Sequence, residues 1–125
     1  MGKTPGRFVR PPSQKVSEEM KAWAAALVAE LATWPQVHSR VFFGFTAIYR
    51  QKRVFALVPR TRPLEPPNSV ALKFESRHIM ARARRDSRIG FAEMQKARWF
   101  TFAMNTDTDL RDALAWLLRA YEAAV

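Results

Sequence analysis

Residues 40–58 read RVFFGFTAIYRQKRVFALV, and this stretch decides the fold class. Valine, isoleucine and aromatic residues dominate both halves of it, and these residue types are enriched in β-strands. The polar pair at 51–52 separates the halves and marks the tip of a hairpin, although the usual Asn-Gly signal is absent. We therefore expect one strand over 40–50, in which Gly44 marks a bulge or a close backbone approach, and a return strand over 53–58.

Two further strands are predicted from the alternation of large apolar residues with smaller or polar ones. The first covers residues 69–74, and the second covers residues 98–104. Four prolines lie in 59–68, so this segment is expected to be a stiff loop that is too long for a tight turn. Residues 86–96 carry no clear pattern, although Gly90 marks a turn.

Two amphipathic helices flank these strands. Ser17 is the expected N-cap of the first, Pro35 ends it, and Thr106 or Asp107 caps the last. A shorter helix is expected over 76–85. The apolar stripes of the two long helices have i, i+3, i+4, i+7 spacing and consist of Met20, Trp23, Ala24, Leu27, Val28 and Leu31, then Leu110, Ala113, Leu114, Leu117 and Tyr121.

Strands grouped between helices favour an α+β fold. We expect a two-layer sandwich, in which an antiparallel sheet of about five strands has helices packed on one face. Residues 1–16 are expected to form a basic, proline-rich arm, and residues 17–125 a single α+β domain. The other face of the sheet is then exposed or carries a partner.

The composition of the chain narrows its class. The sequence has 125 residues, 48% of them apolar, which is enough for a hydrophobic core. It has no cysteine, so disulfides and thiolate metal sites are excluded. Residues 1–15 lack the apolar run of a secretory signal, and no apolar stretch is long enough to span a membrane. The default expectation is a cytoplasmic protein.

The positive charge is concentrated in the middle of the chain. The formal net charge is +10, and residues 40–98 alone hold fourteen Lys or Arg against four Asp or Glu. A field of this kind attracts polyanions. The partners that this charge favours are nucleic acid and an acidic protein. The alternative is that the charge serves solubility alone.

Arginine dominates the basic segments, and its guanidinium binds phosphate in a bidentate fork. Phe91 and Tyr49 are the aromatic residues expected to stack on bases beside these arginines. The alternative reading of each cluster is a solvated surface. The predicted nucleic-acid-binding residues are Arg60, Arg62, Arg77, Arg82, Arg84, Arg85 and Arg88.

No pattern of catalytic residues stands out. His38 and His78 are the only histidines, and neither has the spacing of a zinc site. Asp107, Asp109 and Asp112 lie at a helix start, where carboxylates stabilise the helix dipole without any metal. We therefore expect neither an enzyme nor a cofactor or metal site. A cleft that places a histidine beside carboxylates would revive an enzymatic function.

The run FGFTAIY at 43–49, followed by KRVFALV at 52–58, resembles the N-terminal domain of the TfoX family. There an FGG-x-G-x-Y strand turns into a GK-x-FAL strand and then into an LYLK strand, in whose place VALK stands at 70–73. The end of the chain, ARWFTF at 97–102 with its last helix, resembles the related MmcQ/YjbR-like proteins. The match covers residues 18–123, but Phe45 replaces a second glycine and the proline-rich loop is an insertion.

The resemblance implies a two-layer α+β sandwich like that of type III secretion chaperones. TfoX-like proteins are linked to competence regulation, and MmcQ/YjbR-like proteins are labelled DNA-binding, so the resemblance implies a regulatory or DNA-binding role. It carries over no set of functional residues. The C-terminal strand and helix also resemble small luciferase domain-like proteins of unknown function.

Two functions remain open from the sequence. The first is a non-enzymatic nucleic-acid-binding or regulatory module. The alternative is a protein-interaction adaptor or homodimer that uses the open sheet face or an edge strand, because 41–49 is apolar on both faces.

Overall fold

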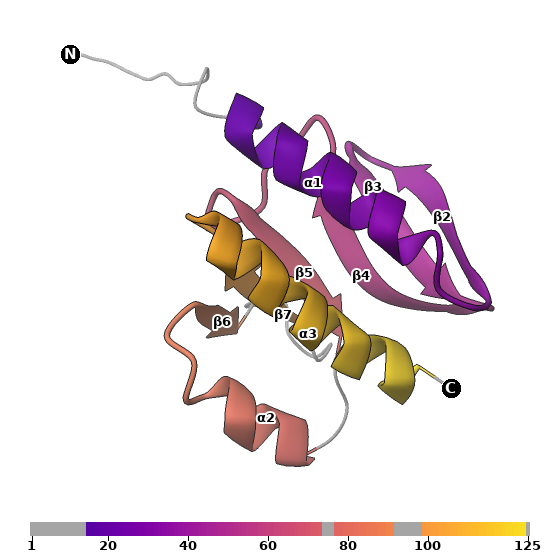
Figure 1. Cartoon of the computed structure of the whole chain (residues 1–125), viewed down its shortest axis with the longest axis vertical. Helices are drawn as coiled ribbons and strands as arrows, with labels where there is room; N and C mark the ends of the chain where they lie inside the picture. The colour runs from indigo at the N-terminus through magenta and orange to yellow at the C-terminus, as the bar shows by residue number, and fades with distance from the viewer. Residues whose placement is uncertain (1–14, 74–76, 92–98, 125) are drawn as a thin grey trace.

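The structure is a computed structural model. It describes residues 15–73, 77–91 and 99–124, except for the side chains of Arg77 and His78. Three helices and six strands follow one another along the chain (Figure 1). The elements are α1 (Glu18–Leu31), β2 (Val37–Phe42), β3 (Phe45–Arg50), β4 (Arg53–Pro59), β5 (Ser69–Lys73), α2 (Arg77–Ala83), β6 (Ile89–Phe91), β7 (Trp99–Ala103) and α3 (Asp107–Ala123).

The strands form one antiparallel sheet in the order β2-β3-β4-β5-β7-β6. All three helices lie on the same side of it, with α1 over the β2–β4 half and α3 over the β5–β7 half (Figure 1). The predicted α+β class, with helices on one face of an antiparallel sheet, is therefore confirmed. The sheet has six strands rather than about five.

Two strands were not predicted separately. One is β6, which lies in the segment 86–96 that carries no clear pattern, and Gly90, which was expected to mark a turn, is the middle residue of this strand. The other arises because the predicted strand over 40–50 reverses in its middle. Phe43 and Gly44 have φ angles of +46° and +89°, so they form the two-residue turn of a β2–β3 hairpin. The expectation of one continuous strand was wrong here. Turns of this type usually carry Asn-Gly, and phenylalanine at a positive φ gives no sequence signal. The reversal also explains why both faces of the run looked apolar.

The carbonyl of Gly44 holds the next loop in place. The backbone N–H groups of Arg60, Thr61 and Arg62 all donate to it, at N···O distances of 3.0, 2.9 and 3.1 Å. The side chain of Arg62 packs so closely on Gly44 that a Cβ atom there would lie 2.7 Å from the Arg62 Cγ. Gly44 is thus a close backbone approach as well as a turn residue.

The second hairpin was predicted correctly. Its tip lies at 51–52 between β3 and β4, and Gln51 adopts a positive φ of 55°. The register shifts between Ile48 and Tyr49, because Ile48 pairs with Ala56 and Tyr49 pairs with Val54. Phe55 is therefore an extra residue in β4, and this β-bulge turns its side chain into the core, where it contacts Tyr121.

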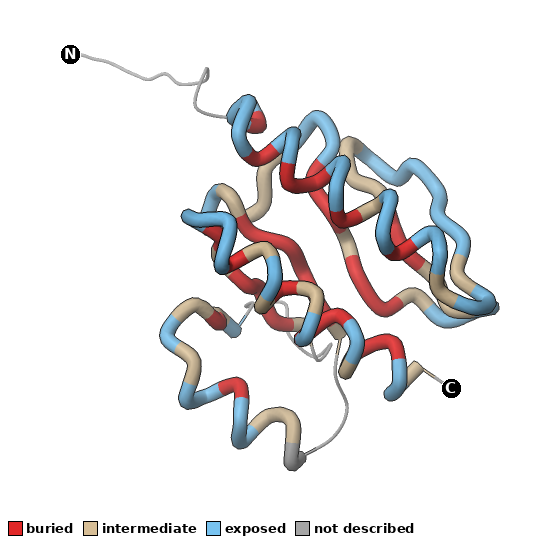
Figure 2. The backbone as a smooth tube through the Cα atoms, viewed as in Figure 1, coloured by how far each residue is buried: buried red, intermediate tan, exposed pale blue. Residues whose placement is uncertain are grey.

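The core lies between the helices and the sheet (Figure 2). Of the predicted stripes, most residues are buried, whereas Val28, Leu110 and Leu114 are half-buried. The prediction missed Trp116 and Ala120 on α3, which are also buried. Phe100, Phe102 and Met104 point into the core as their alternation predicted.

The helix caps agree with the sequence. The Ser17 hydroxyl accepts from the backbone N–H of Met20, and Thr106 and Asp109 form a reciprocal capping box at the start of α3. Val16, which was assigned to the arm, is buried in the core, so the packed domain begins before Ser17. The first residue of the short helix predicted over 76–85, Ser76, lies outside the described residues.

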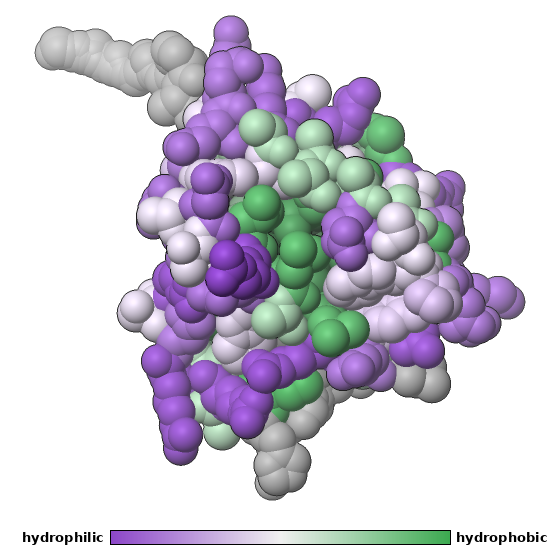
Figure 3. Space-filling model, viewed as in Figure 1, coloured by the Kyte–Doolittle hydropathy of each residue, from purple (hydrophilic) through white to green (hydrophobic). Residues whose placement is uncertain are grey.

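The side of the molecule that carries the helices is largely hydrophilic (Figure 3). Apolar surface shows there as a strip between α1 and α3. In the described part of the chain, no helix has the length and apolar character needed to cross a bilayer.

For the Phe43–Gly44 turn, we predict that substitutions at the two adjacent positions change the free energy of unfolding in opposite directions. Replacing Phe43 by Asn should raise the free energy of unfolding by about 1 kcal/mol, because Asn tolerates a positive φ better than Phe. Gly44→Ala should lower it by about 1–2 kcal/mol, because alanine is strained at a φ of +89° and its Cβ meets the Arg62 side chain. Urea denaturation measures both. A destabilised Phe43→Asn variant would contradict this account of the turn.

Candidate nucleic-acid interface

We call the sheet face opposite the helices the open face. It is hollow because one row of side chains that crosses it is mostly small. Directly paired residues of an antiparallel sheet point to the same side. In the register, Ala47 pairs with Leu57, Leu57 with Ala71, and Ala71 with Thr101. This row crosses four strands, and three of its four side chains are small.

Larger side chains surround this row and enclose a cavity of about 750 Å³. Tyr49 and Trp99 lie on strands β3 and β7, and Phe42 and Phe91 lie nearer the two edges of the sheet. Leu64 and its neighbours in the proline-rich loop close one end. The cavity is lined by Phe42, Ala47, Tyr49, Val54, Leu57, Pro63, Leu64, Glu65, Ala71, Phe91, Trp99 and Thr101.

Both aromatic residues that the sequence suggested for base stacking, Tyr49 and Phe91, line this cavity. The sequence did not single out Trp99, although its alternation with Phe100 was the available signal. Trp99 faces away from the core because Phe100 faces into it. The cavity floor was not predictable from any one strand, because its small residues come together only through the register.

Basic side chains stand around the cavity. Arg40 pairs with Ala47, and Lys73 pairs with Trp99, so both lie on the open face. The guanidinium of Arg84 lies 5.4 Å from the ring centroid of Phe91, which pairs with the core residue Phe100, so this contact does not place Arg84 on the open face. Among the described residues that line the cavity, one is charged, the carboxylate Glu65. The open face therefore combines an apolar, aromatic centre with a mainly cationic border.

The predicted arginines fall into two groups along the chain. Arg60 and Arg62 are exposed in the loop that precedes β5. Arg82, Arg84 and Arg85 are exposed on α2 and just after it. The side chain of Arg77 lies outside the described residues.

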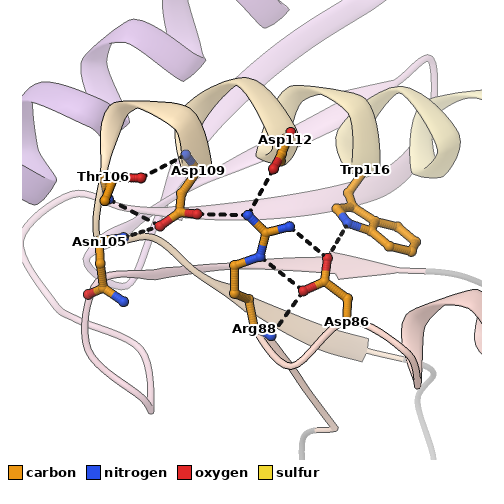
Figure 4. Close-up of polar contacts among 7 residues, drawn as sticks. All are labelled: Asp86, Arg88, Asn105, Thr106, Asp109, Asp112 and Trp116. Carbon is orange, nitrogen blue, oxygen red and sulfur yellow. Dashed lines mark hydrogen bonds and ion pairs between the residues drawn. The ribbon is translucent and has the colours of Figure 1, made fainter.

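Arg88 has a different environment from the other predicted arginines (Figure 4). Its guanidinium donates to Asp86 with N···O distances of 2.9 Å, to Asp109 at 2.7 Å and to Asp112 at 2.9 Å. These four residues, which we call the Arg88 cluster, join the loop before β6 to α3. The indole N–H of Trp116 also donates to Asp86. We therefore assign Arg88 a structural role rather than a phosphate contact.

The ion pairs shift the pKa values of Asp86, Asp109 and Arg88 in the expected directions. Hydrogen bonds from the Arg88 side chain lower the pKa of Asp86, and burial partly opposes this. Backbone N–H donation from Asn105 and then the Arg88 side chain lower the pKa of Asp109. Hydrogen bonds to the carboxylates, Asp86 first, raise the pKa of Arg88. Asp86, Asp109 and Arg88 are therefore charged at neutral pH.

The described residues give the surroundings of one histidine and of the three aspartates at the start of α3. His38 stacks on Tyr49 with ring centroids 5.1 Å apart, and His78 lies outside the described side chains. Asp107 accepts a hydrogen bond from the Trp23 indole, Asp109 caps α3 and Asp112 pairs with Arg88. Within residues 15–73, 77–91 and 99–124, no three His, Cys, Asp or Glu residues are grouped to hold a metal.

No protein-family model matches the sequence, and no curated protein matches it significantly. The resemblance to the TfoX and MmcQ/YjbR families remains a prediction.

The Arg88 cluster generates a prediction for stability and its pH dependence. Arg88→Met should lower the free energy of unfolding at pH 7 by about 2 kcal/mol, because it leaves half-buried carboxylates unpaired. Arg85→Met, at an exposed position three residues away, should change it by less than about 0.5 kcal/mol.

At acidic pH, the free energies of unfolding of the wild type and of Arg88→Met should differ less than they do at pH 7. The folded-state pKa values of Asp86 and Asp109 are lowered, so their stabilisation is present above the unfolded value of about 3.9 and lost as pH falls through the folded values. Urea denaturation from pH 7 down to about pH 3 measures this. A difference that stays constant over that range would show that Arg88 stabilises through packing rather than charge.

Proposed function

We propose that the protein is a non-enzymatic nucleic-acid-binding module, which serves as a binding or regulatory domain. The observation that carries the proposal is that exposed arginines of this protein have no carboxylate partner among the described residues. Within the described residues, no ion pair joins Arg60, Arg62, Arg82, Arg84 or Arg85 to a carboxylate. Their guanidinium groups are thus available for phosphate.

Arg88 provides the contrast within the same chain. Arg88, which joins the loop before β6 to α3, has three carboxylates around its guanidinium. The exposed arginines lack such partners among the described residues, and maintaining many unpaired like charges costs stability through self-repulsion. A polyanionic partner would offset that cost. The net charge of +10 supports the same proposal.

The proposal predicts strongly salt-dependent binding. Fluorescence anisotropy with labelled oligonucleotides should give micromolar or tighter affinity at about 0.15 M salt. The log–log salt slope should be steeper than about −2, because about 0.7 counterions are released per phosphate neutralised on a single strand. Joint alanine substitution of Arg82, Arg84 and Arg85 should make the slope shallower by about 0.7 for each phosphate that these side chains no longer neutralise.

A matched control removes the same formal charge elsewhere. Lys52, Arg53 and Arg111 are exposed at the β3–β4 tip and on α3, and their joint replacement by alanine should change the slope much less. Equal effects of the two triple variants would mean that binding follows net charge alone. No binding at 0.15 M salt would contradict the proposed function itself.

A second candidate function, homodimerisation through an edge strand, is favoured by the apolar end of β2. Strand β2 is at one edge of the sheet. Val41, Phe42 and Phe43 are exposed to 65%, 49% and 75% of their surface. Exposed apolar residues on an edge strand favour pairing with another chain. Phe43 also occupies a backbone position that disfavours it, which suggests a role other than stability.

The hydrogen-bond pattern of β2 leaves backbone groups available for such pairing. In a two-residue hairpin the residues flanking the turn exchange hydrogen bonds, and the bonded positions then alternate. Donation from the Gln51 N–H to the Gln36 carbonyl places the even-numbered residues of this register toward β3. The N–H and C=O groups of Ser39 and Val41 therefore point away from the sheet.

The edge-strand candidate predicts a dimer that a charge on β2 dissociates. Light scattering at high micromolar concentration should give about twice the chain mass of 14.4 kDa. Val41→Lys should yield a monomer, because a charged residue on an edge strand opposes pairing. Leu118→Lys, at a 43% exposed apolar position on α3, should leave the dimer intact. A wild-type monomer at all concentrations would exclude this function.

A further inference from the structure

We infer that the open face binds single-stranded nucleic acid by stacking unpaired bases on its aromatic side chains. This inference rests on the proposed function and adds to it a site and a ligand class. The site is the cavity whose floor is Ala47, Ala71 and Thr101 and whose aromatic wall includes Tyr49 and Trp99. The sequence suggested Tyr49 and Phe91 for base stacking beside the arginines, and the structure adds Trp99 and the cavity floor, which the sequence did not single out.

The shape of the cavity suits flat, stackable groups. Small side chains form its floor, so planar rings can approach the sheet closely while larger side chains flank them. Tyr49 on β3 and Trp99 on β7 are three strand spacings apart, which is roughly 14 Å. Sheet faces that present aromatic side chains in this way stack about two or three bases. Alternation along the strands leaves these rings half-buried and directed away from the core.

The distribution of charge suits a strand whose bases point inward. Arg40 and Lys73 lie on the open face beside the cavity, where they would meet a phosphate backbone. Glu65 is in the lining, where a carboxylate would repel phosphate but would accept a hydrogen bond from a base amino group. A cationic border around an aromatic centre is the arrangement of single-strand sites that read bases by stacking.

The same features disfavour two other occupants. In a duplex the base faces are already stacked on one another, so the aromatic rings would gain nothing from it. A second copy of the chain would bring its own Arg40 and Lys73 against those of the first, and like charges at such an interface are repulsive. Single strands supply both the free base faces and the opposite charge.

The test uses the full chain and two labelled probes of equal length, an oligo(dT) and a duplex, at about 0.15 M salt. Three variants perturb the open face without changing its charge: Tyr49→Leu, Trp99→Leu and Ala71→Leu, the last of which fills the cavity floor. Each should weaken oligo(dT) binding by about tenfold or more, because one stacked base is removed or excluded. Duplex binding, which depends on phosphate contacts, should change by less than about twofold.

The control is Trp34→Leu, which removes a half-buried tryptophan from the helix-covered side, where it contacts Tyr121. It should leave oligo(dT) affinity unchanged. Thermal unfolding identifies any variant that fails to fold. Quenching of wild-type tryptophan fluorescence by oligo(dT), absent in Trp99→Leu, gives an independent measure of stacking that needs no affinity change.

The outcomes separate this inference from the function on which it rests. Weaker oligo(dT) binding by the open-face variants, with duplex binding retained, supports both. Equal binding of oligo(dT) by wild type and all three variants overturns the stacking site but leaves phosphate binding by arginines intact. Loss of self-association in these variants, with nucleic-acid affinity unchanged, would make the open face an interface between copies. No binding of either probe would overturn both proposals.

Discussion

A sheet has two faces, and the three described helices cover only one of them. This constraint determines the rest of the molecule. On β3, β4, β5 and β7, most residues that face the helices are apolar and form the core, whereas β2 is largely exposed. The alternate residues must then suit water or a partner, and solvated positions would ordinarily be polar. The open face carries polar residues such as Arg40, Lys73 and Thr101, but alanine, leucine, tyrosine and tryptophan make its centre apolar.

The helices and most of the strands could be predicted because their signals are local. The spacing of Met20, Leu27 and Leu31 defines one buried face of α1 without reference to any other element. The β2–β3 reversal could not be predicted in this way. Asn-Gly strongly favours a two-residue turn, whereas Phe-Gly favours it weakly. The continuous run of apolar residues therefore predicted one strand, although it contains a glycine. The physical compensation, three N–H groups donated to the Gly44 carbonyl, comes from a loop sixteen or more residues later.

For the candidate site, too, the features that depend on local sequence were predicted, and those that depend on distant residues were not. Arg60 and Arg82 were correctly expected to be exposed, because charged residues in loops and short helices usually are. Arg88 looked no different in the sequence, yet it is enclosed by carboxylates from α3. The distinction depends on Asp109 and Asp112, which lie more than twenty positions away. The cavity floor likewise depends on residues from four strands, and none of its alanines is informative alone.

The apolar surface of this protein could be covered by nucleic acid or by a second copy of the chain, and the net charge of the chain affects these two associations differently. A polyanion is attracted by the +10 chain, so its binding weakens as salt screens that attraction over a Debye length of about 8 Å at physiological ionic strength. Two copies of the chain would repel each other, so the same salt would strengthen the proposed pairing through β2. The two associations therefore respond to ionic strength with opposite sign. Nucleic acid would also neutralise the repulsion between copies, and pairing at the β2 edge leaves the open-face row of Ala47 and Ala71 uncovered. The geometry thus allows the two surfaces to act together, with edge pairing favoured once a strand occupies the open face.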